Sequence, residues 1–352
     1  MKSIMDFRRY LAAAAAILVA VGMVSCKKDD DDEETSDYLD GTLTFTVPGF
    51  VQPGDTYTLS PSGVSRPSSD TSTEGLGYYW NLDYIQTTND TVRIESDGPE
   101  VSADYIFNVP DTLCSMDITC AAFANGYYNT SASATVVIVR PYGEERSLQG
   151  IKYDTKKSFT DPRDGKEYPY TTVGGLDWFI DNLSYEGSGT PYFDAAAMTD
   201  IFGMYYTWNE AVSACPSGWR LPSNADFLKT HNAVSGESQT DNLARLNGSA
   251  GSMMVDAYFN DTKLWEYWPA VNITNSTRLG FIPTGYMVSR TDGNHDYLGA
   301  GSYFACWTSD ECNSEQGYYR YIYADKPDII AGSASKKFFS TAIRCVRDSE
   351  TE

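Results

Sequence analysis

The stretch Trp208-Asn-Glu-Ala-Val-Ser-Ala-Cys-Pro-Ser-Gly-Trp-Arg-Leu-Pro-Ser223 contains a complete short helix and the start of a second one. Thr207 precedes it as an N-cap, and Glu210 follows three residues later, the spacing of a capping box. Pro216 ends the helix. One face of this helix is predicted to carry Trp208, Ala211, Val212 and Cys215. Such dense spacing is typical of a fold signature and not of a catalytic motif.

Ser223 is predicted to cap the second helix, with Asp226 in its first turn and Phe227 and Leu228 along it. The sequence around these helices is rich in loops. We therefore expect residues 142–352 to form an α+β domain.

The first half of the chain has a different pattern. Residues 41–141 contain short runs in which apolar and polar residues alternate, separated by turn signals such as Pro53-Gly54. Trp80 lies in one of these runs, where we expect it to be part of the core. The pattern predicts a β-sandwich of immunoglobulin-like type, so the fold class as a whole is mainly β.

The N-terminus has the features of an export signal. Residues 1–25 combine basic residues with an apolar run too short to span a membrane. Met23-Val-Ser-Cys26 resembles a lipobox, which would make Cys26 the lipidated N-terminus; the alternative is a plain secretory signal. Residues 26–40 form an acidic tether, which resembles the export signal of Bacteroidetes surface lipoproteins. We expect an outer-membrane protein that faces outward.

The charge of the chain limits its partners. The net charge is −22, and removal of residues 1–25, which carry +2, would leave −24. Such a surface repels phosphate backbones, so we expect no nucleic-acid partner.

Six cysteines remain after Cys26, and an oxidising compartment permits disulfides between them. Cys114 and Cys120 stand six residues apart. On one extended strand their separation is about 20 Å, far beyond disulfide reach. Either the chain turns between them or both stay reduced, and we favour the reduced state.

Five segments of the second half together resemble the Fibrobacter succinogenes major paralogous domain. They are Arg163-Asp-Gly-Lys166, Trp178…Asn182-Leu183, Gly203…Tyr206-Thr-Trp208, Cys215-Pro-Ser-Gly-Trp-Arg-Leu-Pro222 and Ile343-Arg-Cys-Val346. The resemblance covers about residues 150–348. It implies a C-type lectin-like fold, in which a cysteine at the end of the first helix bonds one in the last strand. The implied disulfides are Cys215–Cys345 and, in the later sheet, Cys306–Cys312.

Two groups of residues are candidates for ligand binding. The first is aromatic: Trp265, Tyr267 and Trp268. The second lies in or beside Asp292-Gly-Asn-His-Asp296, where Asp292, Asn294 and Asp296 place oxygens at alternate positions, with Tyr297 next to them. Tyr319, Tyr321 and Tyr323 would also share one face of a strand. The alternatives are core packing for the aromatic residues and a solvated turn for the acidic ones.

The sequence therefore predicts a lipid-anchored surface protein without a cofactor, although calcium at Asp292, Asn294 and Asp296 is an alternative. We expect a non-catalytic head that binds a glycan or a protein through the loops of residues 255–300. The second hypothesis is a structural or fimbria-associated assembly subunit, and the third is a carbohydrate-active hydrolase.

Overall fold

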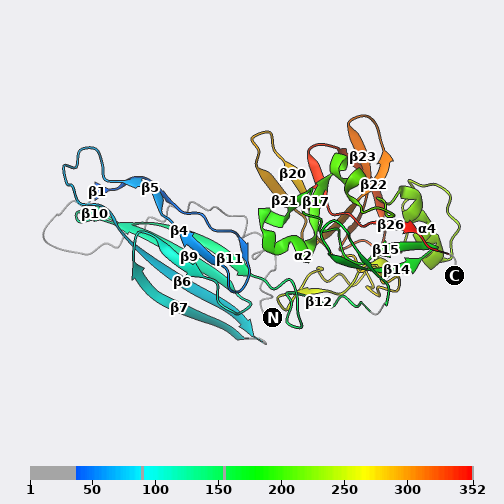
Figure 1. The fold of residues 1–352 in the computed structure, drawn as a ribbon, viewed down its shortest axis with the longest axis horizontal. Coiled ribbons are helices and arrows are strands. Elements are labelled where there is room, and N and C mark those ends of the chain that lie inside the picture. Colours follow the sequence, from blue (N-terminus) through cyan, green and yellow to red (C-terminus); the bar gives the residue numbers. More distant parts are fainter. Residues whose placement is uncertain (1–36, 89–90, 154–155, 351–352) are drawn as a thin grey trace. The chain divides into compact units, whose positions relative to one another are not determined.

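The computed structural model describes residues 37–88, 91–153 and 156–350. Cys26, the export signal and most of the acidic tether lie outside these residues. The chain divides into two compact units, with the boundary between Arg140 and Pro141. β-Strands hold more residues than helices in both units (Figure 1), which confirms the mainly β fold class. Within the described residues, no helix has the length and apolar character that a membrane span requires.

The first unit contains one large sheet and several two-stranded sheets. The large sheet has the order β3-β11-β9-β6-β7, and the small ones pair β1 with β10, β2 with β5 and β4 with β8. The strands are β1 (Asp37–Tyr38), β2 (Asp40–Thr44), β3 (Phe50–Val51), β4 (Thr56–Leu59), β5 (Ser62–Ser65), β6 (Gly77–Thr88), β7 (Thr91–Val101), β8 (Tyr105–Asn108), β9 (Ser115–Phe123), β10 (Tyr127–Tyr128) and β11 (Thr130–Ile138).

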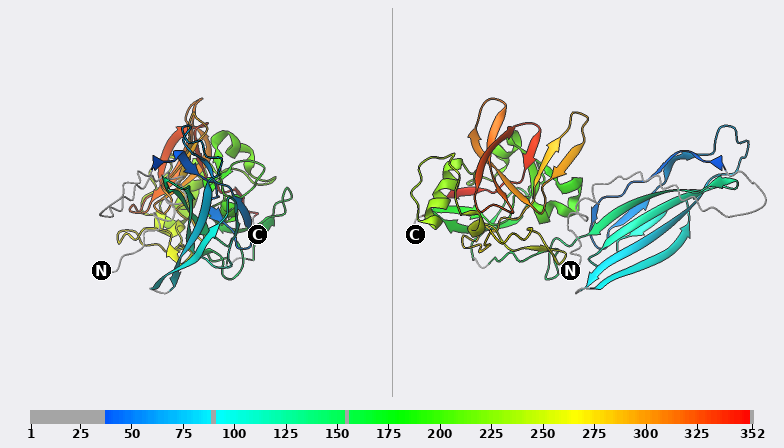
Figure 2. Two further views of the ribbon diagram at one scale, coloured as in Figure 1. Left: turned by 90° about the vertical axis from the view of Figure 1, so that its left-hand side faces the viewer. Right: turned by 180° about the vertical axis from the view of Figure 1, so that it is seen from behind.

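Trp80 lies at the centre of the first unit's core, as expected from the alternation. It is fully buried, and its ring packs against Phe45 and Tyr105. The same core contains Leu43 of β2 and Leu59 of β4, so the short strands pack on one face of the large sheet. Figure 2 shows the blue segments of these strands along one side of the cyan sheet. An immunoglobulin-like connectivity stays a prediction.

Cys114 and Cys120 are buried free thiols. Cys120 pairs with Trp80 across strands β9 and β6, and Cys114 directly precedes β9. Burial raises the pKa of Cys114 to about 11 and that of Cys120 to about 12. Both thiols therefore stay protonated and pack as small apolar groups.

The second unit arranges short sheets around a few short helices. Its helices are η1 (Tyr192–Asp194), η2 (Ala196–Met198), α2 (Thr199–Phe202), α3 (Trp208–Ala214), α4 (Asn224–Ser235) and α5 (Ala250–Met253). Its strands are β12 (Leu148–Gln149), β13 (Ser158–Thr160), β14 (Glu167–Val173), β15 (Leu176–Phe179), β16 (Thr190–Pro191), β17 (Met204–Thr207), β18 (Tyr258–Phe259), β19 (Thr262–Lys263), β20 (Tyr286–Ser289), β21 (His295–Leu298), β22 (Tyr303–Glu311), β23 (Gln316–Tyr323), β24 (Ile330–Ser335), β25 (Phe339–Thr341) and β26 (Val346–Asp348).

Helix α3 begins as the sequence predicts. The Thr207 hydroxyl accepts from the Glu210 N–H, and the Glu210 carboxylate accepts from the Thr207 N–H, which completes the capping box. The predicted apolar face is wrong at one position, because Val212 is 45% exposed. Trp208 and Ala211 are buried as predicted, and Ala214 is buried in addition.

Helix α4 also has a complete capping box, between Ser223 and Asp226. The Asp226 carboxylate additionally accepts two hydrogen bonds from Arg220, with N–O distances of 2.5 and 2.9 Å. Burial raises the pKa of Asp226, but the hydrogen bonds from Arg220 and Ser223 outweigh this effect, so its pKa lies below the usual value.

The final segment of the chain joins the two helices to the sheets. Strand β26 pairs with β15, and Val346 exchanges two backbone hydrogen bonds with Arg220. The predicted disulfide between Cys215 and Cys345 is confirmed, with 5.7 Å between the Cα atoms. It ties the end of α3 to this last segment.

Arg344, next to the disulfide, is a buried cation held by oxygens of two segments, residues 179–182 and 279–280. Its guanidinium donates to the Asn182 side chain and to the main-chain oxygens of Phe179, Leu279 and Gly280, at 2.5 to 3.2 Å. Burial lowers its pKa to about 10, so the group stays charged at neutral pH.

The predicted Cys306–Cys312 disulfide is wrong, because both cysteines are free thiols. Cys306 is buried within strand β22, whereas Cys312 is exposed just after its end. An extended strand separates residues six apart by about 20 Å, which a disulfide cannot bridge.

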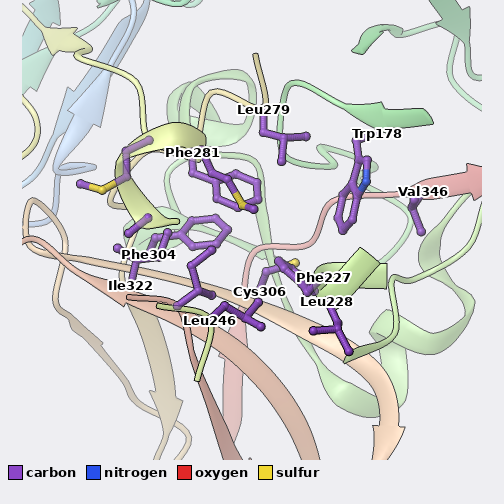
Figure 3. Packing of buried hydrophobic residues seen from close by; sticks show 14 of the residues in the cluster. Trp178, Phe227, Leu228, Leu246, Leu279, Phe281, Phe304, Cys306, Ile322 and Val346 are labelled. Atoms are coloured by element: carbon purple, nitrogen blue, oxygen red, sulfur yellow. The ribbon is translucent and has the colours of Figure 1, made fainter. Parts of the chain in front are cut away.

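The 255–300 region is not an open loop platform, because part of it enters the main core. Leu279 and Phe281 are fully buried and pack with Trp178, Phe227 and β-strand residues (Figure 3). The Phe281 ring stacks on Phe304 at 4.1 Å between centroids. Apolar and polar residues show too little alternation in this region for the sequence to predict this burial.

Loss of the disulfide is expected to destabilise the second unit strongly. The link closes a loop of 130 residues, for which chain entropy gives roughly 5 kcal/mol. The Cys215→Ala/Cys345→Ala chain should therefore unfold at much lower urea concentration than the parent. Cys312→Ser is the control and should shift the unfolding free energy by less than about 0.5 kcal/mol. Equal effects of the two changes would contradict this assignment.

The Asp226 carboxylate is expected to make α4 sensitive to acid. Asp226→Asn should cost about 1–2 kcal/mol at pH 7, because a charged acceptor is lost. Since the folded pKa is lowered, the contribution is complete above the unfolded pKa of about 3.9 and disappears as the pH falls through the folded value. Urea unfolding of both chains between pH 7 and pH 3 should show the difference narrowing.

Asp296→Asn is the matched control, since Asp296 also accepts two hydrogen bonds from an arginine six residues earlier, Arg290. That pair is exposed, and exposed pairs contribute little. A difference that stays constant with pH for Asp226→Asn would contradict the prediction.

Candidate functional site

Four tyrosines form a continuous surface on one face of the β22–β23–β24 sheet. We call Tyr303, Tyr319, Tyr321 and Tyr323 the tyrosine platform. The strand register places Tyr303 opposite Tyr323, and Tyr319, Tyr321 and Tyr323 of β23 alternate onto one face, as the sequence predicts. Figures 1 and 2 show the β22–β23 hairpin and the β20–β21 hairpin projecting from the same end of the second unit.

The rings of the platform contact one another. Tyr303 lies 5.3 Å from Tyr321 and 4.9 Å from Tyr323 between ring centroids, and Tyr319 lies 5.5 Å from Tyr321. The Tyr303 and Tyr319 hydroxyls are 3.4 Å apart. Ring pairs at such distances hold each other in fixed orientations, so the platform is a preformed surface.

The solvent exposure of the platform rings increases from Tyr303 to Tyr323. Tyr303 is buried, Tyr319 and Tyr321 are half-buried, and Tyr323 is 44% exposed. Behind them, Tyr286 packs against Tyr303, and Phe339 packs against Tyr319. The rings at the back are thus anchored, while the outer rings meet solvent.

A glycine on the edge strand lets Tyr319 lie across the sheet. Gly332 of β24 is opposite Tyr319 in the register, and a methyl group there would lie 2.8 Å from Cζ of that ring. Any larger residue would displace the ring from the platform.

The platform offers hydrogen-bond donors at neutral pH. Burial raises the pKa of Tyr303, Tyr319 and Tyr321, so their hydroxyls stay protonated. The chemistry that this surface presents is ring contact plus phenolic hydrogen bonding.

The three predicted aromatic ligands of the 265–268 segment have different environments. Trp265 is buried, and its Nε1 donates to the Phe281 carbonyl at 3.2 Å, so its assignment to a binding surface is wrong. Tyr267 and Trp268 are 76% and 44% exposed, and remain available to a ligand.

The predicted oxygens of the 292–296 turn serve local structure. Asp292 accepts from the Asn294 N–H, which lowers its pKa, and Asp296 is paired with Arg290. No cluster of three metal-ligating His, Cys, Asp or Glu residues occurs in the described part of the chain.

Tyr297 belongs to another aromatic cluster and not to that turn. Its hydroxyl donates to the Pro191 carbonyl at 3.0 Å, and its ring packs against Tyr192 and Phe193. The structure therefore does not join the candidates of residues 265–268 and 292–297 into one site.

Sequence reasoning missed Tyr303 as a member of the platform. Its contribution depends on the pairing of β22 with β23, and period-two alternation along one strand gives no register. The alternating tyrosines of β23 were the sequence feature that predicted this face.

Comparison with solved structures gives only weak likenesses. The superoxide reductase (neelaredoxin) of Ignicoccus hospitalis is 10% identical over 30% of this chain and 86% of its own, with a TM-score of 0.20. Spo0M, a sporulation control protein of Bacillus subtilis, is 11% identical over 40% of this chain and 65% of its own, with a TM-score of 0.18. TM-scores this low do not indicate a shared fold. A search of the curated proteins found no match.

A family model gives a direct result for the second unit. The model of the Fibrobacter succinogenes major domain matches residues 171–347, which is half of the chain and includes helices α3 and α4, both disulfide cysteines and the tyrosine platform. The chain belongs to the Fibrobacter succinogenes major domain family.

Proposed function

We propose that this chain is an outward-facing lipoprotein of the outer membrane with a non-catalytic role, and that it binds a protein partner through the tyrosine platform. The observation that carries the proposal is the graded exposure of four mutually packed tyrosines. Rigid tyrosines bring a large contact area at low entropic cost, and they are enriched in protein interfaces.

A protein fits the platform better than a glycan does. Sugar hydroxyls need planar polar side chains beside the stacking ring, whereas the neighbours of the platform rings are mainly other aromatic groups such as Tyr286 and Phe339. Aromatic anchors of this kind carry much of the binding energy in protein interfaces.

Assembly is the second candidate function, because of the edge strand β24. Its sequence, Ile-Ala-Gly-Ser-Ala-Ser, contains neither a charge nor a proline. Native edge strands normally carry such blocking residues, and the edge strand β7 does, with Asp97, Pro99 and Glu100. Strand addition at β24 would join the chain to a neighbouring subunit.

Lipidation at Cys26 is a separate part of the proposal. In cells given a labelled fatty acid, the parent chain should incorporate the label and sediment with the outer membrane. Cys26→Ser should abolish both, while Cys312→Ser, which changes an exposed free thiol, should leave both intact. Label in the Cys26→Ser chain would contradict the lipoprotein assignment.

The platform is tested by photo-cross-linking in intact cells. Benzoylphenylalanine in place of Tyr323 should give a discrete adduct with one protein, and an added Tyr321→Ser change should reduce it about tenfold, because the neighbouring anchor is lost. The same group in place of Tyr128, an exposed tyrosine of the first unit, is the control. Equal adducts at both positions, or none at Tyr323, would refute the platform as a protein-binding surface.

A further inference from the structure

A cavity of about 510 Å³ opens in the second unit, with no residue in common with the tyrosine platform. Its walls come from the segment of residues 141–153, the start of β14, the residues that follow β15, and helix α2. This volume is in the range of small-molecule sites. The polar groups in its wall decide which ligand it fits.

Two of the cations in the wall are already satisfied by the protein. Lys166 pairs with Asp200 at 3.0 Å and donates to the Ser184 carbonyl at 2.9 Å. Arg344 is occupied by the oxygens described above. These groups therefore shape the cavity and have little bonding capacity left for a ligand.

Asp181 and Arg146 differ from these two satisfied cations, because both of them contact Tyr153. The Tyr153 hydroxyl donates to Asp181 Oδ1 at 2.7 Å, and the Arg146 guanidinium lies over the Tyr153 ring, 5.0 Å from its centroid. A carboxylate accepts up to four hydrogen bonds and a guanidinium donates five. Both groups therefore keep capacity for a ligand in the cavity.

Burial raises the pKa of Asp181, and the Tyr153 hydrogen bond and the charges of Arg344 and Arg146 lower it only in part. The carboxyl group is thus held toward its protonated form. A hydroxyl group is the ligand group that suits both forms, since it donates to a carboxylate and accepts from a carboxylic acid.

The charges of the wall exclude other ligand classes. A phosphate would face Asp181 and Asp200, while a divalent cation or an ammonium group would face Arg146 and Arg344. Ile151 and Ile282 add an apolar surface for the carbon side of a ring.

We propose that this cavity binds one neutral saccharide unit, with Asp181 and Arg146 hydrogen-bonding to neighbouring hydroxyls of the sugar ring. Tyr153 is a positioning residue that holds both groups. The site is independent of the protein-binding role proposed for the platform.

A panel of methyl glycosides tests the cavity, using saturation-transfer NMR and calorimetry on the full chain. At least one glycoside should bind with a Kd on the order of 1 mM or tighter. Asp181→Ala, which removes the carboxyl group, and Arg146→Gln should each weaken binding about tenfold or more. Glu315→Gln is the control, since this exposed carboxylate is not part of the cavity wall and its loss should leave the Kd within about twofold.

Three results would overturn the proposal: no glycoside bound at about ten times that concentration, glycoside binding unchanged in both variants, or equal weakening by Glu315→Gln. Thermal unfolding of each variant shows whether it is folded. If Asp181→Ala does not fold, Tyr153→Phe, which keeps the ring beneath Arg146, takes its place with the same expected loss. The cross-linking experiment at Tyr323 does not depend on these outcomes.

Discussion

A buried positive charge organises the second unit. The Arg344 guanidinium has no contact with bulk water, so each of its N–H groups needs an oxygen inside the protein. It finds main-chain oxygens at the end of β15 and in the segment of residues 279–280, and a side-chain oxygen at Asn182. Those segments can only adopt conformations that bring their oxygens to this one point. The neighbouring Cys215–Cys345 disulfide adds helix α3 to the same junction.

This junction carries the tyrosine platform. Just before Arg344, Thr341 of β25 donates a hydrogen bond to the Ala305 carbonyl of β22 at 2.9 Å. Trp307, on the same strand, donates to the Tyr206 carbonyl at 2.8 Å. The strand that presents Tyr303 is therefore tied to the last segment of the chain and to the strand before α3. A surface made of half-exposed rings keeps its geometry because its base is fixed in this way.

The parts of the fold that the sequence predicted are those set by neighbours along the chain. Both capping boxes need only residues three positions apart, and the alternation around Trp80 and along β23 gave the correct faces. The family resemblance supplied Cys215–Cys345, which no local pattern could pair. The same resemblance implied the Cys306–Cys312 pairing, which is wrong because β22 runs extended from Cys306 to Glu311. The binding role of Trp265 failed because core burial depends on contacts with distant segments. Tyr303 and the Asp181 cavity were missed because register and cavity walls are three-dimensional properties.

The two proposed sites depend on different kinds of interaction, and they share no residue. The platform gains affinity by covering aromatic rings, and it tolerates few charges because an uncompensated charge would lose its water when a partner docks. The cavity does the opposite: Asp181, Arg146 and Tyr153 are held by one another, so a sugar would meet polar groups that are already oriented. A strongly acidic chain, at −22 overall, has reason to bind neutral ligand groups at both places. Rings and hydroxyls do not change charge, so recognition through them is less exposed to the repulsion that such a surface imposes on anionic partners.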